Sequence, residues 1–312
     1  MAALITAKEV MTMINAAGVS KRFGEIQALC NISLAIREQA VFGLIGTNGA
    51  GKSTFLRLLS GVLKADSGDI LIEEQPVFEN PALKQSFFFI PDDPFFFTNS
   101  RPVDMRDYYA AIYENFDKEQ FNRLLSAFDL APRRKINTFS KGMKKQLAII
   151  CALAARTAYI FCDETFDGLD PMMRQGVKSL FAEAIAERGL TPVIASHNLR
   201  ELEDICDHVG LLHQGGMLLT RDLEGLRLGV HKVQAVFGEP QRHKEDFPDL
   251  KIESLKHSGA LHTMVIQGER EEVERLLTAY EPLYMEVLPL TLEEVFLYET
   301  EVVGYDIKSL LL

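Results

Sequence analysis

The sequence predicts an α/β protein in which helices pack on a mostly parallel sheet. From about residue 13 to residue 220, short apolar runs rich in β-formers alternate with longer segments of helical period. The predicted strands Ala40–Ile45, Tyr159–Cys162 and Pro192–Ala195 each end where a loop of polar or glycine residues begins. Open α/β sheets bind ligands at the carboxyl ends of their strands, so these loops are the first candidates for a functional site.

A helical insertion and a second domain complete the predicted organisation. From about Asp93 to Thr138, two amphipathic helices, roughly Asp104–Tyr113 and Lys118–Phe128, predict a helical subdomain of the first domain, 13–220. The segment 221–312 predicts a small α/β domain. Its expected elements are a strand His231–Phe237, a hairpin of Ile252–His257 with Leu261–Gln267, a helix with Val273, Leu276, Leu277 and Tyr280 on one face, a strand Tyr284–Leu288, and a last helix that begins at a capping box of Thr291 and Glu294.

Hydropathy predicts a cytoplasmic protein that reaches a membrane only through a partner. The longest apolar run, Leu147–Ala155, ends at Arg156 and is shorter than the roughly 18 residues that span a bilayer. Lys8 and Glu9 interrupt the apolar core that a secretory signal needs. A net charge of −11 argues against nucleic acid as a partner, because binding phosphates takes a basic face.

The four cysteines predict neither a zinc site nor a disulfide framework. No two of them have the C-x-x-C spacing. We expect buried thiols in a reducing compartment. The cysteines are Cys30, Cys151, Cys162 and Cys206.

The loop after the strand Ala40–Ile45 matches G-x-x-x-x-G-K-[ST] completely, and a helix follows at once. Glycines there let successive backbone N–H groups point at a phosphate, and the helix N-terminus adds its positive end. Lys52 is predicted to reach the β- and γ-phosphates of a nucleotide, and the Ser53 hydroxyl to bind Mg²⁺. The match arises by chance in roughly one chain of this length in a hundred. The predicted phosphate-binding residues are Gly46, Thr47, Asn48, Gly49, Ala50, Gly51, Lys52, Ser53 and Thr54.

Two carboxylates follow the strand Tyr159–Cys162. Adjacent side chains at a strand end point to opposite sides, so Asp163 is predicted to hold Mg²⁺ while Glu164 faces the γ-phosphate and polarises the attacking water. The alternative is a pair of solvated carboxylates. The apolar strand before them and the phosphate loop favour the functional interpretation.

The order of these motifs resembles the ATP-binding cassette (ABC) family. In that family a signature motif, LSGGQ, lies as far before the Asp-Glu pair as Phe139–Met143 lies before Asp163. Asp170 resembles the aspartate of the D-loop, His197 the switch histidine that contacts the γ-phosphate, and Phe23 the aromatic residue that stacks on adenine. For Phe23 a place in the core is the alternative. The resemblance covers about residues 13 to 216.

The resemblance implies a P-loop NTPase core with a mostly parallel sheet, an antiparallel β subdomain and a helical subdomain. It also implies an ATPase whose catalytic residues are Lys52, Glu164 and His197, with ATP and Mg²⁺ as cofactors. Ser140 and Gly142 would complete the nucleotide pocket of a second ABC ATPase subunit. ATP would then be sandwiched in a dimer, either of identical or of related subunits, that works beneath an integral-membrane permease on the inner face of the cell membrane.

Three positions depart from the family pattern. The signature reads FSKGM, and Thr165 stands where a proline is common. Asp92 follows Pro91 where the family usually has a glutamine. A carboxylate can ligate Mg²⁺ but adds negative charge beside a triphosphate. We predict that Asp92 is a metal ligand, and a surface residue without a nucleotide role is the alternative.

Two groups of phenylalanines flank Asp92. Phe87–Phe89 is predicted to belong to a core strand. Phe95–Phe97 is predicted to form an exposed patch for a permease helix, with packing inside the helical subdomain as the alternative.

The function that these observations predict is ATP-driven transport, and the C-terminal domain ending in TLEEVFLYETE resembles that of bacterial exporter ATPases. Import stays open, and so does a mainly regulatory role for the C-terminal domain. The rival from another class is a soluble ABC ATPase of translation or DNA repair. Such proteins carry tandem cassettes, long coiled coils or zinc modules, which this sequence lacks.

Overall fold

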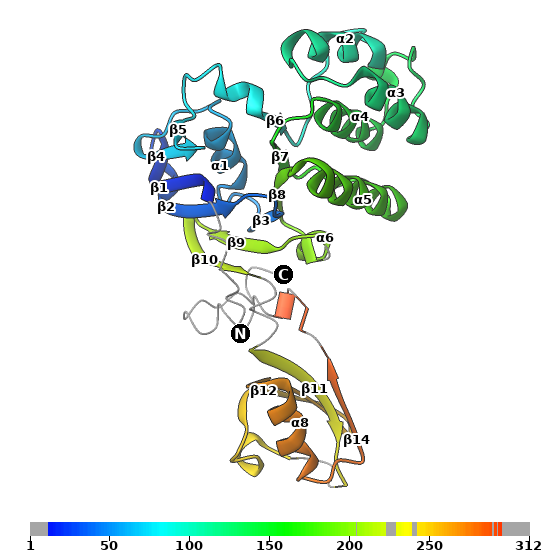
Figure 1. Cartoon of the computed structure of the whole chain (residues 1–312). Coiled ribbons are helices and arrows are strands. Elements are labelled where there is room, and N and C mark those ends of the chain that lie inside the picture. Colours follow the sequence, from blue (N-terminus) through cyan, green and yellow to red (C-terminus); the bar gives the residue numbers. More distant parts are fainter. Residues whose placement is uncertain are drawn as a thin grey trace, which may run out of the picture. The chain divides into compact units, whose positions relative to one another are not determined.

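The structure, a computed structural model, describes residues 12–203, 205–222, 229–238, 242–288, 290, 291, 293 and 294. The chain divides into two compact units, Met1–Thr220 and Arg221–Leu312 (Figure 1). The helices in the described part of the chain lack the length and apolar character that crossing a membrane requires.

A six-stranded sheet forms the centre of the first unit, in the order β10-β9-β3-β8-β7-β6. The four strand pairs from β9 to β6 are parallel. Its central strands are buried on both faces, which explains why they read as continuous apolar runs. The predicted mostly parallel sheet is confirmed. The strands are β3 (Phe42–Ile45), β6 (Phe87–Ile90), β7 (Tyr159–Asp163), β8 (Thr191–Ser196), β9 (His208–His213) and β10 (Gly216–Asp222).

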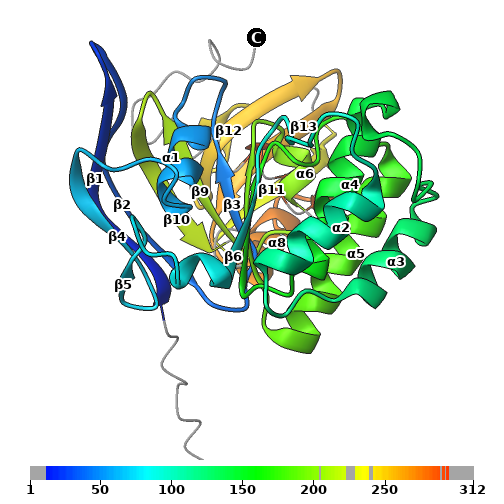
Figure 2. The ribbon, with the colours of Figure 1, turned by 90° about the horizontal axis from the view of Figure 1, so that it is seen from above.

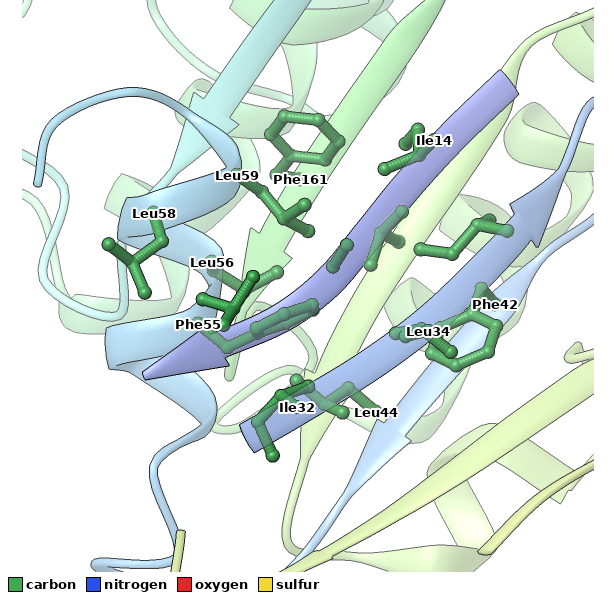
Figure 3. Close-up of a cluster of buried hydrophobic side chains, with 14 of the residues drawn as sticks. Ile14, Ile32, Leu34, Phe42, Leu44, Phe55, Leu56, Leu58, Leu59 and Phe161 are labelled. Atoms are coloured by element: carbon green, nitrogen blue, oxygen red, sulfur yellow. The ribbon is translucent and has the colours of Figure 1, made fainter. Parts of the chain in front are cut away.

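A second, antiparallel sheet packs beside helix α1 (Lys52–Leu59). Its order is β2-β1-β4-β5, with β1 (Thr12–Phe23), β2 (Ile26–Arg37), β4 (Ser67–Ile72) and β5 (Gln75–Pro76). Figure 3 shows Ile14, Leu34, Phe42, Phe55 and Phe161 meeting in one buried cluster, which ties both sheets to α1. This cluster fixes the start of α1 relative to the end of β3, where the phosphate loop lies.

The helical subdomain lies on the opposite side of the parallel sheet from the antiparallel sheet (Figure 2). It contains α2 (Pro102–Ile112) and α3 (Lys118–Ala127), which pack against α4 (Lys141–Ala154). Asp117 caps α3 by accepting a hydrogen bond from Gln120 N at 2.8 Å. The remaining helices of the unit are the 3-10 turns η1 (Leu83–Ser86) and η2 (Ile136–Thr138), α5 (Pro171–Arg188) and α6 (Leu199–Glu203).

The described part of the second unit contains an antiparallel sheet in the order β12-β13-β11-β14. Side chains of β11 and β13 pack against helix α8 and form with it the hydrophobic core of the second unit. The predicted capping box is present, because Thr291 N donates to Glu294 Oε2 at 3.0 Å and Glu294 N donates to Thr291 Oγ1 at 3.2 Å. The rest of the predicted last helix lies outside the described residues. The elements are β11 (Val230–Val236), η3 (Lys244–Asp246), β12 (Lys251–Ser258), β13 (Leu261–Gln267), α8 (Arg270–Thr278) and β14 (Tyr284–Leu288).

Two local predictions need correction. Cys30 is exposed, because it lies on the outward face of β2 between the inward-facing Leu29 and Ile32; the other three cysteines are buried as predicted. Tyr280 lies beyond the end of α8, although its ring still packs against the core of the second unit.

Candidate functional site

The phosphate loop connects β3 to α1, and at two of its positions another part of the backbone lies so close that only glycine fits. A Cβ at Gly46 would lie 2.3 Å from Leu212 O, and one at Gly51 would lie 2.6 Å from Ala28 O. Gly51 also has a φ of 108°, which disfavours any other residue. Gly51 is the N-cap of α1 and no side chain caps this helix, so the N–H groups of its first turn face the loop. This arrangement suits an anion.

Lys52 is a buried ammonium whose partners lie within the site. Its Nζ donates to Gly46 O at 2.8 Å and to Thr47 O at 3.2 Å, and it lies 3.1 Å from Glu164 Oε1. The residue is only 5% exposed, so these contacts satisfy a charge that water barely reaches. The loop therefore presents a fixed positive charge.

Ser53 and Asp163 form the pair best suited to a divalent cation. The Ser53 hydroxyl donates to Asp163 Oδ1 at 3.0 Å, and Asp163 is 1% exposed. Burial raises the pKa of Asp163; the Ser53 hydrogen bond opposes this, while the charges of Glu164 and Asp92 add to it. The described residues contain no cluster of three or more His, Cys, Asp or Glu side chains arranged for a metal. A cation here would need phosphate oxygens to complete its shell.

Glu164 joins the ends of two strands to the phosphate loop. Its N–H donates to Ala195 O at 2.9 Å, and its φ is 47°, in the left-handed region. Its Oε2 lies 2.8 Å from His197 Nδ1 and accepts from His197 N at 3.3 Å. With Oε1 paired to Lys52, the carboxylate bridges the loop after β3 and the loop after β8.

Asp92 also follows the carboxyl end of a strand, two residues after β6 ends at Ile90. Its Oδ1 is 3.0 Å from Lys145 Nζ, and its side chain is 62% exposed. Lys145 Nζ also donates to Glu164 O at 2.6 Å. Lys145 was not among the predicted site residues, although an acidic residue in place of glutamine is a signal for a basic partner nearby.

The signature and D-loop residues form a second group around Gly168. Ser140 is the N-cap of α4, where its hydroxyl accepts from Met143 N at 3.2 Å. A Cβ at Gly142 would lie 3.0 Å from Gly168 O, so the close approach of the two segments favours glycine. Asp170 caps α5 by accepting from Met173 N at 3.0 Å.

Phe23 is the last residue of β1. It is 45% exposed, so the core alternative is excluded. Lys21 Nζ lies 5.7 Å from the centroid of its ring. An exposed ring beside a cation is suited to stacking on a base.

A phosphate loop joined through Glu164 to two neighbouring strand ends defines a P-loop nucleoside triphosphatase. The chain belongs to the ATP-binding subunits of ABC transporters, and it is an ABC transporter ATPase. The family model described as ABC transporter matches residues 29–167. The predicted family, fold class and enzyme class are confirmed.

Two relatives and one solved structure carry this assignment. The chain is 32% identical to the ABC transporter ATP-binding protein YtrB of Bacillus subtilis, over 91% of this chain and 97% of the relative. It is 30% identical to the bacitracin transport ATP-binding protein BcrA of Bacillus licheniformis, over 66% of this chain and 69% of that protein. A solved structure of an ATP binding subunit of an ABC transporter superposes with a TM-score of 0.64 at 26% identity, covering 69% of this chain and 92% of the other.

Proposed function

We propose that this chain hydrolyses ATP with Mg²⁺ at the site around Lys52 and Glu164, and that this reaction drives a substrate through a separate permease. The observation that supports the proposal best is the carboxylate of Glu164, which lies within 3.1 Å of Lys52 Nζ and 2.8 Å of His197 Nδ1. Steady-state release of phosphate by the purified chain, with and without Mg²⁺, tests it.

The proposed chemistry assigns each side chain a separate role. Phosphate oxygens bind the N–H groups of the loop and compete with Glu164 for the Lys52 ammonium, which frees the Glu164 carboxylate to polarise a water. Ser53 and Asp163 hold Mg²⁺, which offsets the charge of the phosphates. His197 contacts the γ-phosphate, and the Phe23 ring stacks on adenine.

For Asp92 a direct contact with Mg²⁺ stays a prediction. Its charge contributes to the raised pKa of Asp163, which supports a role for Asp92 beside the Ser53–Asp163 pair. Its Oδ1 is engaged by Lys145 instead. The Mg²⁺ dependence of an Asp92→Asn variant distinguishes the two roles.

The proposed active form is a dimer with ATP at two shared sites. Ser140 is exposed, and Asp170 is exposed at the start of the neighbouring helix α5. Because these two helix N-termini are exposed, they can bind the nucleotide held by a second ABC subunit, identical or related. The dimer binds a permease on the inner face of the cell membrane. Export is the proposed direction, by analogy with the exporters that the C-terminal sequence resembles.

An exposed aromatic cluster of Phe95, Phe97 and Tyr108 is the proposed docking surface for the permease. Phe95 is 74% exposed and Phe97 45% exposed. The ring centroids of Phe95 and Phe97 are 5.8 Å apart, and those of Phe97 and Tyr108 are 4.8 Å apart. Exposed aromatic rings in contact with each other are typical of protein interfaces.

Replacing Phe95 and Phe97 together by alanine is expected to leave ATP hydrolysis by the isolated chain within about twofold of the wild type. The permease's stimulation of hydrolysis should fall by roughly tenfold or more, because two aromatic anchors each contribute on the order of 1–2 kcal/mol to binding. Val62→Ala, which removes an exposed apolar side chain elsewhere, is the control. Unchanged stimulation in the double variant would remove this surface from the interface.

A truncation that ends after Asp222 tests the proposed accessory role of residues 221–312. This cut keeps β10 whole, and the second unit has its own core, so the first unit should keep its fold. We expect ATP affinity within about threefold of the full chain, with a change in coupling or in dimer stability instead. Complete loss of ATP binding in a folded truncated protein would show that the two units form one domain.

A further inference from the structure

We propose that Lys145 is a positioning residue for Glu164: its ammonium holds the Glu164 main chain in place, and Asp92 is its charged partner. The proposal rests on the proposed role of Glu164 in polarising water. It extends that role to a buried cation on α4, the helix that Ser140 caps.

The surroundings of Lys145 explain why it has a fixed position. The residue lies near the start of α4 and is 6% exposed. Its Nζ donates to Glu164 O at 2.6 Å and pairs with Asp92 Oδ1 at 3.0 Å. A buried ammonium is costly without a counter-charge, and the Glu164 carbonyl is neutral. Asp92 supplies the negative charge that keeps Lys145 beside Glu164.

Glu164 needs such support because of its backbone conformation. A φ of 47° is unfavourable for a residue with a side chain, so its surroundings must hold it there. Its N–H is held by Ala195 O at 2.9 Å, and its C=O is held by Lys145 Nζ. These two anchors set the direction of the carboxylate toward Lys52 and His197.

The same contact joins Glu164 to the proposed docking surface. Asp92 stands three residues before Phe95 on a segment that leaves the sheet at the end of β6. Lys145 therefore links three parts of the unit: the segment that carries the aromatic cluster, the start of α4, and the backbone of Glu164. If that segment moved, the Lys145 ammonium would transmit the movement to Glu164.

Replacing Lys145 by methionine keeps its length and removes the charge and the hydrogen bonds. We expect kcat for ATP hydrolysis to fall about tenfold, with the KM for ATP within about twofold, since a misplaced reacting group slows turnover more than it weakens binding. Lys145→Arg keeps the donors and should restore most of the rate. Lys118→Met removes an ion pair with Asp107 in which both side chains are 55% exposed, and should leave the rate unchanged.

Asp92→Asn tests the pair from its exposed side; because it leaves the buried Lys145 ammonium without its counter-charge, thermal unfolding of the variant is measured alongside. The substitution should lower kcat by about threefold, and the double variant with Lys145→Met should be no slower than Lys145→Met alone. The Mg²⁺ concentration for half-maximal activity should stay the same in all three. If Asp92→Asn shifts that concentration while Lys145→Met does not, Asp92 acts on the metal and the proposed pair is wrong.

Glu164→Gln, assayed in parallel, separates this proposal from the one on which it rests. If Glu164→Gln is inactive while folded Lys145→Met and Asp92→Asn both hydrolyse ATP at the wild-type rate, the positioning role is refuted and the role of Glu164 stands. If Glu164→Gln keeps the wild-type rate, the role of Glu164 fails first. A kcat that falls in Lys145→Met and recovers in Lys145→Arg supports the positioning role.

Discussion

Replacing Glu164 by glutamine is expected to abolish steady-state ATP hydrolysis while ATP binding is kept. An amide of the same shape cannot accept a proton from the attacking water, and a lost general base costs roughly 100-fold to 10,000-fold in rate. ATP affinity should stay or rise, because the carboxylate that pairs with Lys52 at 3.1 Å no longer competes with the phosphates or repels them.

Phosphate release and ATP binding must be measured on the same preparation of this variant. Glu183→Gln makes the same change at an exposed glutamate of α5 and should hydrolyse ATP normally. Lys52→Ala is the complementary variant, and it should lose binding as well as turnover because it removes the fixed charge of the loop. Normal hydrolysis by Glu164→Gln would exclude Glu164 as the base.

A Ser140→Arg substitution should abolish ATP-dependent dimerisation. In the Glu164→Gln background, which retains ATP, the chain is expected to form a dimer when ATP and Mg²⁺ are present. Arginine at the exposed N-cap of α4 places a long side chain where the partner's nucleotide would bind. Losing the cap costs only about 1 kcal/mol, so the subunit should stay folded.

Sedimentation at saturating ATP measures this effect. Ser126→Arg introduces the same side chain at an exposed position of α3 in the same subdomain and should leave the dimer intact. A dimer of undiminished stability in the Ser140→Arg protein would contradict the sandwich arrangement.

The parts of the fold that are determined by residues close together in the chain could be predicted from the sequence. The buried strands β3, β7 and β8 are short apolar runs, and the phosphate loop is a contiguous motif between a strand and a helix. These strands and this loop are formed by residues adjacent in the sequence. The spacing of those residues is therefore enough to locate them.

The contact of Lys145 with Asp92 could not be predicted in this way. The two residues are 53 positions apart, and they meet only because α4 lies against the end of β6. Nor could the sequence decide between the two interpretations of Phe95–Phe97. The structure exposes Phe95 and Phe97 and half-buries Phe96, so part of the run packs inward and part faces out. Such outcomes depend on tertiary packing, which propensity and periodicity do not encode.

Purification of the tagged chain from detergent-solubilised membranes, followed by an ATPase assay of the complex, tests whether this chain is the ATPase subunit of a membrane transporter. We expect a stoichiometric partner with several membrane-spanning helices and a complex that hydrolyses ATP with Mg²⁺. The same complex should assemble with the Glu164→Gln chain and show no turnover. Recovery of the chain with ribosomes or DNA and no membrane partner would exclude this transport function, and full turnover in the Glu164→Gln complex would exclude Glu164 as the base.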